Sequence, residues 1–293
     1  MPIQTVRFQN TIRRTCHVHG RGYWSGQPVQ LTFLPADPDV GIRFVRTDLP
    51  GRPQICAISS NRIEMPLRTR LRQNNAEVDM VEHVMAALYG LRIDNCLIEC
   101  DAGEMPGLDG SAQAVVLALQ QAEVERQGKA RETRIIEEPI RMGDSSQWLV
   151  AMPADDHRLH VEYRLDFGPN QAISSGTAAC ALTPNNFAEH ISAARTFISA
   201  KDAKLLQEKG LATHVTDRDL VVFGDDGPVN NTLRYPDECA RHKLLDLVGD
   251  IALCGHDICG RIIACRTGHA ANGRLAEKIR TLPPKIHIAV KAA

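Results

Sequence analysis

The chain has 293 residues, of which 43% are hydrophobic and 24% charged, and its formal net charge is −1. This length and composition are typical of a soluble protein that folds into two ordinary domains. The near-neutral charge excludes the strong basic field with which nucleic-acid-binding proteins attract phosphates, so we expect no nucleic-acid partner.

Segments that would direct the chain to a membrane or out of the cell are not evident. The first residues, MPIQTVRFQN, lack the charged-then-apolar pattern of a signal peptide, and the apolar run at 114–119 is far too short to cross a bilayer. We therefore expect a cytoplasmic protein. Nine cysteines without a C-x-x-C pair favour reduced, mostly buried thiols, and Cys100 and Cys265 are expected to be small core residues. A metal ion would need histidine and carboxylate ligands.

The chain begins with strand-like segments at 5–12, 16–20, 29–35 and 42–49, which are rich in β-branched and aromatic residues. His17 and His19 alternate on the second of these and point to one face. No carboxylate or third histidine lies near them in sequence, so a metal site there is disfavoured.

The segment DMVEHVMAALYG, at 79–90, predicts a helix with His83 nearly opposite its apolar stripe and Glu82 to the side. The stripe consists of Val81, Val84, Met85 and Leu88. Glu82 has two interpretations. It is either the third residue of a capping box whose N-cap is Asp79, or a catalytic carboxylate.

An internal repeat relates two parts of the chain. Residues 87–103, ALYGLRIDNCLIECDAG, and residues 252–268, ALCGHDICGRIIACRTG, agree in seven of seventeen columns at an offset of 165. Each copy predicts a helix end, a glycine, a short strand and a glycine turn, which indicates a duplication. We therefore predict an α+β protein of two similar lobes, 1–130 and 131–293, divided within the polar stretch 125–134.

The second lobe repeats the strand-rich opening of the first, with strands predicted at 148–154 and 157–167. Its longest helix contains RHKLLDLVGD, at 241–250. His242, Asp246 and Asp250 recur there at i, i+4 and i+8, opposite an apolar stripe formed by Leu244, Leu247, Val248, Ile251 and Ala252. This polar face is either solvated or part of a site. In a duplicated protein, a site in the cleft between lobes would bring it to His83.

Two histidines and one carboxylate, His83, His242 and Asp246, are the number and type of ligands that hold a catalytic zinc ion. Glu82 adjoins His83 and could act as a general base towards water. His269 follows Gly268 in a turn ahead of a predicted helix and is a candidate acid for a leaving amine, although a capping or surface histidine is an equally simple interpretation.

These segments resemble a known family. VEHVMAALYGLRIDN, GEMPGLDGSA, ISAARTF, RHKLLDLVGD and RTGHAANGRL occur in the order and approximate spacing found in the bacterial UDP-3-O-acyl-N-acetylglucosamine deacetylases, zinc enzymes of the committed step of lipid A biosynthesis. The resemblance extends over residues 4–280. It implies a sandwich of two β-α-α-β lobes with helices between two sheets, a UDP-linked acyl sugar as substrate, and a monomer that touches the inner membrane surface only transiently.

The resemblance also implies roles for single residues. The zinc ligands fall on His83, His242 and Asp246, and the general base on Glu82. His269 matches the group that protonates the leaving amine, and Asp250 the residue that orients it. The remaining implied contacts are the oxyanion-side hydroxyl of Thr196 and the substrate-binding residues Phe197, Lys243 and Arg266, the last in place of a common lysine.

Two departures from the family's pattern concern the substrate. The first-lobe loop Gly-Leu-His-Ser/Thr-Gly is replaced here by residues 22–26, GYWSG, which puts Trp24 at the position of the histidine. An insert expected at 197–222 would form the acyl-chain passage. Two rival functions remain open from the sequence: a zinc amidohydrolase for another acylated sugar, and a non-catalytic nucleotide-binding or ribosome-associated α+β protein.

Overall fold

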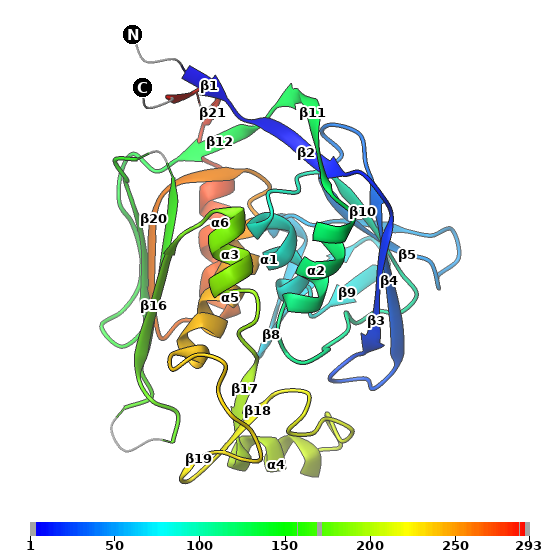
Figure 1. Ribbon diagram of the computed structural model, residues 1–293, viewed down its shortest axis with the longest axis vertical. Helices are drawn as coiled ribbons and strands as arrows, with labels where there is room; N and C mark the ends of the chain where they lie inside the picture. Colours follow the sequence, from blue (N-terminus) through cyan, green and yellow to red (C-terminus); the bar gives the residue numbers. More distant parts are fainter. Residues whose placement is uncertain (1–3, 157, 169–171, 287, 291–293) are drawn as a thin grey trace.

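Two sheets enclose a central layer of helices in the computed structural model, which describes residues 4–156, 158–168, 172–286 and 288–290 (Figure 1). One sheet carries strands from the first half of the chain, and the other sheet carries strands from the second half. The helices α1, α2, α3, α5 and α6 lie between them (Figure 1). The predicted α+β sandwich is thus confirmed. Residue 157, the first of one predicted strand, lies outside the described residues.

The first half contains eleven strands and two α-helices among the described residues, together with a short 3₁₀ helix at Ser59–Asn61. The elements are β1 (Gln4–Val6), β2 (Phe8–Ile12), β3 (Cys16–Arg21), β4 (Pro28–Pro35), β5 (Ile42–Arg46), β6 (Gln54–Cys56), β7 (Arg62–Met65), β8 (Arg68–Gln73), β9 (Ala76–Asp79), α1 (Glu82–Gly90), β10 (Cys96–Cys100), α2 (Gln113–Gln121) and β11 (Val124–Ala130).

The second half follows directly. Its elements are β12 (Glu132–Ile135), β13 (Ile140–Gly143), β14 (Trp148–Met152), β15 (Leu159–Leu165), β16 (Gly176–Ala181), α3 (Pro184–His190), β17 (Phe197–Ser199), α4 (Ala200–Glu208), β18 (Val221–Gly224), β19 (Gly227–Pro228), α5 (Glu238–Ala252), β20 (Asp257–Cys265), α6 (His269–Arg280), β21 (Pro284–Ile286) and β22 (Ile288–Val290).

Strand pairing follows the same plan in both sheets. β10 lies between α1 and α2 in the chain and pairs antiparallel with β4 and parallel with β5. β20 lies between α5 and α6 and pairs antiparallel with β14 and parallel with β15. Ile98 is opposite Phe33 and Phe44, while Ile263, 165 residues later, is opposite Val150 and Glu162. The sequence repeat therefore corresponds to a repeat of strand order.

The helices α1 and α5 form the centre of the molecule. A side chain at Gly249 of α5 would begin 2.0 Å from the main-chain oxygen of Glu82, so only glycine permits this approach of the two helices. Even their polar residues are shielded: Glu82, His83, His242, Asp246 and Asp250 are all buried. The polar faces predicted from helical periodicity are thus not solvated faces, and they meet at the α1–α5 contact.

The segment predicted as an insert, 197–222, forms β17, α4 and the start of β18, below the layered body in Figure 1. It is tied to the loop at 22–26, because the Tyr23 hydroxyl donates to the Asp219 carbonyl and His214 Nε2 contacts the Gly22 carbonyl. Helix α4 has no buried residue.

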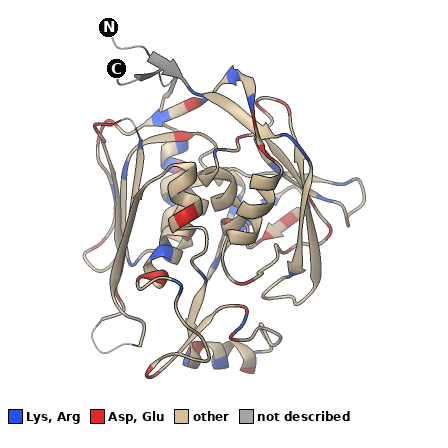
Figure 2. Cartoon of the chain, in the orientation of Figure 1, with Lys and Arg blue, Asp and Glu red and all other residues tan. Residues whose placement is uncertain are grey.

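The charged residues and the cysteines are distributed as follows among the described residues. Lys and Arg are interspersed with Asp and Glu over the described residues drawn in Figure 2. No helix in the described part of the chain is long and apolar enough to cross a membrane. All nine cysteines are free thiols within the described ranges, and Cys100 is buried as predicted. The prediction for Cys265 was wrong: it ends β20 and is only partly buried.

Candidate metal centre and catalytic groups

His83, His242 and Asp246 meet where the first turn of α1 crosses α5. They form the one group of described residues with the spacing of a metal site, and their ligand atoms lie within 4.8 Å of one another. Asp246 Oδ1 lies 3.6 Å from His83 Nε2 and 3.5 Å from His242 Nε2. Two ligands about 2.0 Å from a tetrahedral zinc ion are separated by roughly 3.3 Å, so these distances fit such an ion.

The protonation of these groups supports the same interpretation. Burial lowers the pKa of His242 to about 4, so its imidazole is neutral. Its Nδ1 lies 3.2 Å from the Ala194 carbonyl, which places the ring proton there and leaves a lone pair on Nε2. Burial opposes ionisation of Asp246, but the Lys243 charge holds the pKa of this carboxyl well below its usual range.

Two acceptor atoms therefore face each other across 3.5 Å, His242 Nε2 and Asp246 Oδ1. Asp246 Oδ1 is buried and finds no hydrogen-bond partner among the described residues, whereas Oδ2 accepts from Lys243 Nζ at 2.6 Å. An unpartnered buried carboxylate oxygen is costly, and a cation shared by both atoms removes that cost. The donor set thus fits a divalent metal such as zinc.

Glu82 is the first residue of α1 and is 2% exposed. The capping-box interpretation was wrong, because the N-cap is Val81 while Asp79 belongs to β9 and pairs with Arg68 and Arg70. The Glu82 carboxylate instead accepts from the main-chain N–H of Thr69 at 3.0 Å. Burial raises its pKa above the ordinary value, which suits a general base.

His269 lies at the start of α6 and contacts the same centre. Its Nδ1 lies 2.9 Å from Asp250 Oδ2, and its Nε2 lies 3.9 Å from Asp246 Oδ2. Burial acts against protonation, but the charge of Asp250, followed by that of Asp246, raises the pKa of His269 to about 9. His269 is therefore an imidazolium at neutral pH that can donate from Nε2. It is neither a helix cap nor a surface residue, as its 8% exposure shows.

Phe197 and Thr196 lie on the insert side of the centre. The Phe197 ring stands edge-on to His242, with 6.0 Å between centroids, and also contacts Phe167 and Phe223. The Thr196 hydroxyl donates to the Gly110 carbonyl at 3.0 Å. The Phe197 ring thus lies beside His242, and Thr196, the preceding residue, is held to the Gly110 loop.

Arg266 and Trp24 contact side chains outside the centre. Arg266 is 45% exposed in its side chain and faces Asp166 at 3.7 Å. The Trp24 ring lies 4.4 Å from the Arg68 guanidinium carbon, and its Nε1 is buried without a partner in the part of the chain that the structure describes.

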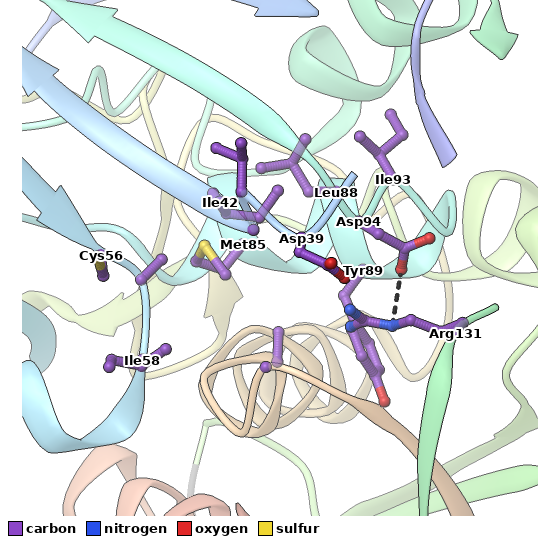
Figure 3. Close-up of a pocket in the computed structure, with 15 residues that line it drawn as sticks. Asp39, Ile42, Cys56, Ile58, Met85, Leu88, Tyr89, Ile93, Asp94 and Arg131 are labelled. Atoms are coloured by element: carbon purple, nitrogen blue, oxygen red, sulfur yellow. Dashed lines mark ion pairs between the residues drawn. The ribbon is translucent and has the colours of Figure 1, made fainter. Parts of the chain in front are cut away.

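Other features do not join this centre. His17 is exposed on β3, where its Nδ1 contacts the Thr32 hydroxyl. The pocket of about 240 Å³ in Figure 3 is lined by Met85, Leu88 and Tyr89 of α1 and by the Asp94–Arg131 ion pair. His83 lies in the first turn of that helix, and none of His83, His242 and Asp246 is among the described residues that line the pocket.

Three contacts of the centre were missed by the sequence analysis: Thr69, Asn272 and the Ala194 carbonyl. Asn272 donates to Asp250 at 3.0 Å and lies one turn after His269, so helical spacing could have indicated it. Thr69 belongs to strand β8, and the Ala194 contact is made by the main chain. No sequence pattern indicates either contact, because only tertiary packing brings these groups to the centre.

Comparison with known proteins agrees with this geometry. Residues 9–281 match the family model described as "LpxC: UDP-3-O-acyl N-acetylglycosamine deacetylase". Curated relatives named UDP-3-O-acyl-N-acetylglucosamine deacetylase include one from Geobacter sp. (strain M21), 34% identical over 94% of this chain and 90% of the relative. Another, from Anaeromyxobacter dehalogenans (strain 2CP-C), is 36% identical over 94% of this chain and 88% of the relative.

A third relative of the same name, from Shewanella halifaxensis (strain HAW-EB4), is 36% identical over 92% of this chain and 88% of its own length. The matched region includes every residue of the centre described above. Similarity of this extent, over nearly the whole of both chains, establishes the family. The chain belongs to the LpxC family of UDP-3-O-acyl-N-acetylglucosamine deacetylases.

Proposed function

We propose that the protein uses zinc to hydrolyse the N-acetyl group of UDP-3-O-(3-hydroxyacyl)-N-acetylglucosamine, the committed step of lipid A biosynthesis. The observation that carries the proposal is the position of two further titratable groups, Glu82 and His269, beside the candidate metal ligands His83, His242 and Asp246, in a chain of this family. The names of the relatives supply the class of substrate, a UDP-linked acyl sugar.

His83, His242 and Asp246 would hold the metal. The hydrogen bond from His242 Nδ1 to Ala194 and the one from Lys243 to Asp246 would fix two of these ligands in place. When bound, zinc supplies Lewis-acid chemistry, which polarises a carbonyl oxygen and makes water more acidic.

Glu82 and His269 would divide the proton transfers of amide hydrolysis. Glu82, ionised and buried, takes the proton of the attacking water as the C–O bond forms. His269 starts the reaction as an imidazolium and donates its Nε2 proton to the departing nitrogen as the C–N bond breaks, so that acetate and a free amine are released. Asp250, on the far side of the ring, holds the imidazolium in orientation.

The remaining residues would bind and position the substrate. Thr196 would stabilise the oxyanion once its hydroxyl proton turns from the Gly110 carbonyl, and the Lys243 charge would support the same oxygen. Phe197 would pack against the acyl sugar beside His242. We assign Arg266 to the diphosphate, which suits its exposed guanidinium, and Trp24 to a packing contact with the head group.

We further propose that the reaction takes place in the cytoplasm and that the protein acts as a monomer. The acyl product would reach the membrane by transient contact of the protein with the inner membrane surface. The exposure of Phe167, Leu205 and Leu211 around the insert supports such a contact, because apolar side chains in water are stabilised at a lipid surface.

Mass spectrometry of the products tests the function. The purified protein is incubated with the UDP-linked 3-O-acyl-N-acetylglucosamine, and separately with N-acetylated sugars that lack either the UDP or the 3-O-acyl group. We expect acetate and the free amine from the first substrate at a kcat/KM at least about 10²-fold higher than from the others. Equal or faster hydrolysis of another acylated sugar would replace the proposed substrate, and no hydrolysis of any would refute the enzyme assignment.

A further inference from the structure

Thr69 is a fully buried residue of β8 at the point where that strand touches both α1 and α5. Its main-chain oxygen accepts from the N–H of Val81, the N-cap of α1. Its main-chain N–H donates to Glu82 Oε2 at 3.0 Å, and its hydroxyl donates to Asp250 Oδ1 at 2.5 Å. One residue therefore contacts the carboxylates on both sides of the metal centre.

The hydroxyl contact completes the environment of Asp250. Asp250 Oδ2 accepts hydrogen bonds from His269 Nδ1 at 2.9 Å and from Asn272 Nδ2 at 3.0 Å. Without Thr69, the other oxygen, Oδ1, would therefore have no hydrogen-bond donor among the contacts described here. Asp250 is 0% exposed, and water cannot easily replace the missing donor. Donors on both oxygens prevent rotation of the carboxylate, and this fixes the plane in which the His269 ring lies.

The main-chain contact does the same for Glu82. The N–H of Thr69 is directed at the carboxylate instead of at a neighbouring strand, and it holds Oε2 on the side of β8. Because threonine is β-branched, its own side-chain rotamer is restricted, so the hydroxyl and the N–H keep a constant relative position. The base and the Asp250–His269 pair are thus held by the same rigid residue.

We propose that Thr69 is a positioning residue that sets the proton acceptor Glu82 and the proton donor His269 at their working separation across the metal centre. It acts on His269 through Asp250 and touches neither the ligands nor the substrate. The proposal rests on the roles given to Glu82 and His269 under the proposed function, and it adds a residue from a fourth element, β8, to the residues of α1, α5 and α6.

Steady-state kinetics of three variants test it. Thr69→Val keeps the volume and the main-chain N–H but removes the hydroxyl, and we expect kcat to fall about 10-fold with KM and bound metal unchanged. Thr69→Ser keeps the hydroxyl and should stay within about 3-fold of the wild-type kcat. Thr11→Val is the matched control. Thr11, in β2, is also buried, and its hydroxyl donates to the main-chain oxygen of Asn95.

Non-additivity identifies the route. If Thr69 acts through Asp250, then Thr69→Val should cause little further loss in an Asp250→Asn background, because the carboxylate that it positions is already gone. A full additional 10-fold loss in that background would overturn the proposed route. An unchanged kcat in Thr69→Val, or a Thr69→Ser variant as impaired as Thr69→Val, would overturn the role of the hydroxyl itself.

A readout without turnover separates this proposal from the proposed function. The Nδ1–H proton of His269 should give a downfield NMR resonance, assigned by its loss in His269→Ala. We expect this resonance to move in Thr69→Val and to stay in Thr11→Val, even if the substrate assignment fails. If Thr69→Val does not fold, Thr69→Cys, a weak donor of similar size, replaces it: a shifted resonance and a lowered kcat support the proposal, and wild-type values for both refute it.

Discussion

The two repeated units have the same strand order, but their corresponding helices, α1 and α5, carry the candidate site residues at different positions. α1 has 9 residues and α5 has 15, so that α5 extends towards its N-terminus beyond the part that corresponds to α1. At the offset of 165, Glu82 and His83 correspond to Leu247 and Val248, which are core residues, and Asp246 corresponds to Val81, which is buried in the core of the first unit.

This difference shows that the repeat extends to the strand order and not to the candidate site. The first unit carries one proposed ligand, His83, and the proposed base, Glu82, in the first turn of its short helix. The second unit carries the other two proposed ligands on the longer helix, and Asp250 and His269 as well. The centre is therefore formed once, at the α1–α5 crossing, instead of twice in symmetric copies. The expected effects of substitutions on the two units follow from this asymmetry.

The largest expected effect is that of Asp246→Ala, which removes a ligand contributed by the second unit. Bound metal should fall below about a tenth of an equivalent, and kcat should fall on the order of 10³-fold, because Lewis-acid stabilisation is worth several kcal/mol. Elemental analysis of protein purified without added metal provides the measurement.

Two controls sharpen this comparison. Val81→Ala, at the corresponding position of the first unit, should lower the thermal midpoint and leave the metal in place. Asp250→Ala should retain more metal than Asp246→Ala, since Asp250 contacts His269 and not the ligands. Wild-type protein that is active in chelator without metal would contradict the assignment of the centre.

The next effect concerns proton transfer, which the two units share. Glu82→Gln and His269→Gln should each lower kcat about 10²-fold while retaining the metal, the usual size for a positioned acid or base. Measurement of kcat and of metal content separates this loss from loss of the ligand set. A 10²-fold rise in KM at constant kcat would instead mean that these residues bind substrate.

The pH dependence of kcat distinguishes the roles of the two groups. Glu82 must be ionised, and because burial raises its pKa, activity should begin to fall at a higher pH than for an ordinary glutamate as the solution is acidified. His269 must be protonated, so activity should fall again as the pH rises through about 9. Glu82→Gln should lose the acidic limb. Loss of the basic limb in this variant would show that the roles are reversed.

A smaller effect is expected for the crossing itself. Gly249→Ala would place a methyl group against the Glu82 main chain, whereas the corresponding residue of the first unit is Val84. Overpacking of this kind costs about 1–3 kcal/mol, and we expect a lower thermal midpoint together with a lower kcat as α1 moves from α5. Gly128→Ala, where a Cβ meets nothing within 4 Å, is the control and should change neither quantity.

Much of this arrangement could be predicted from the sequence. The repeat and the helical periodicity indicated two α+β units, and the i, i+4, i+8 spacing of His242, Asp246 and Asp250 identified one polar face of a helix. Which further residues meet that face depends on the helix crossing, about which local sequence carries no information. Glu82 illustrates the limit, because the capping-box pattern was present but the helix begins at Glu82 itself.

Thr69 illustrates the limit more strongly. Within TRLRQ it looks like an ordinary strand residue, and its contact with Asp250 spans 181 positions of the chain. Asn272 was more accessible to prediction, since it lies on the same face of α6 as His269. His242 and Asp246 could be placed on one face because their spacing is local within α5. The approach of His83 and of the supporting residues could not be predicted in this way, because they come from other elements.

The smallest effect is expected at Trp24, where the first unit departs from its family's usual loop. The two tryptophans of the chain lie one in each unit, and each ring lies near an arginine: Trp24 near Arg68 at 4.4 Å, and Trp148 near Arg164 at 5.6 Å. If the Trp24 loop covers the substrate, Trp24→His should change KM by about 5-fold, or roughly 1 kcal/mol, with kcat and bound metal unchanged. Trp148→His, in the outer sheet of the second unit, should leave KM unchanged. A substantially lower thermal midpoint for Trp24→His with an unchanged KM would instead mean that the indole packs against Arg68 and does not contact the substrate. The first unit would then contribute to the site only the proposed ligand and the proposed base of α1.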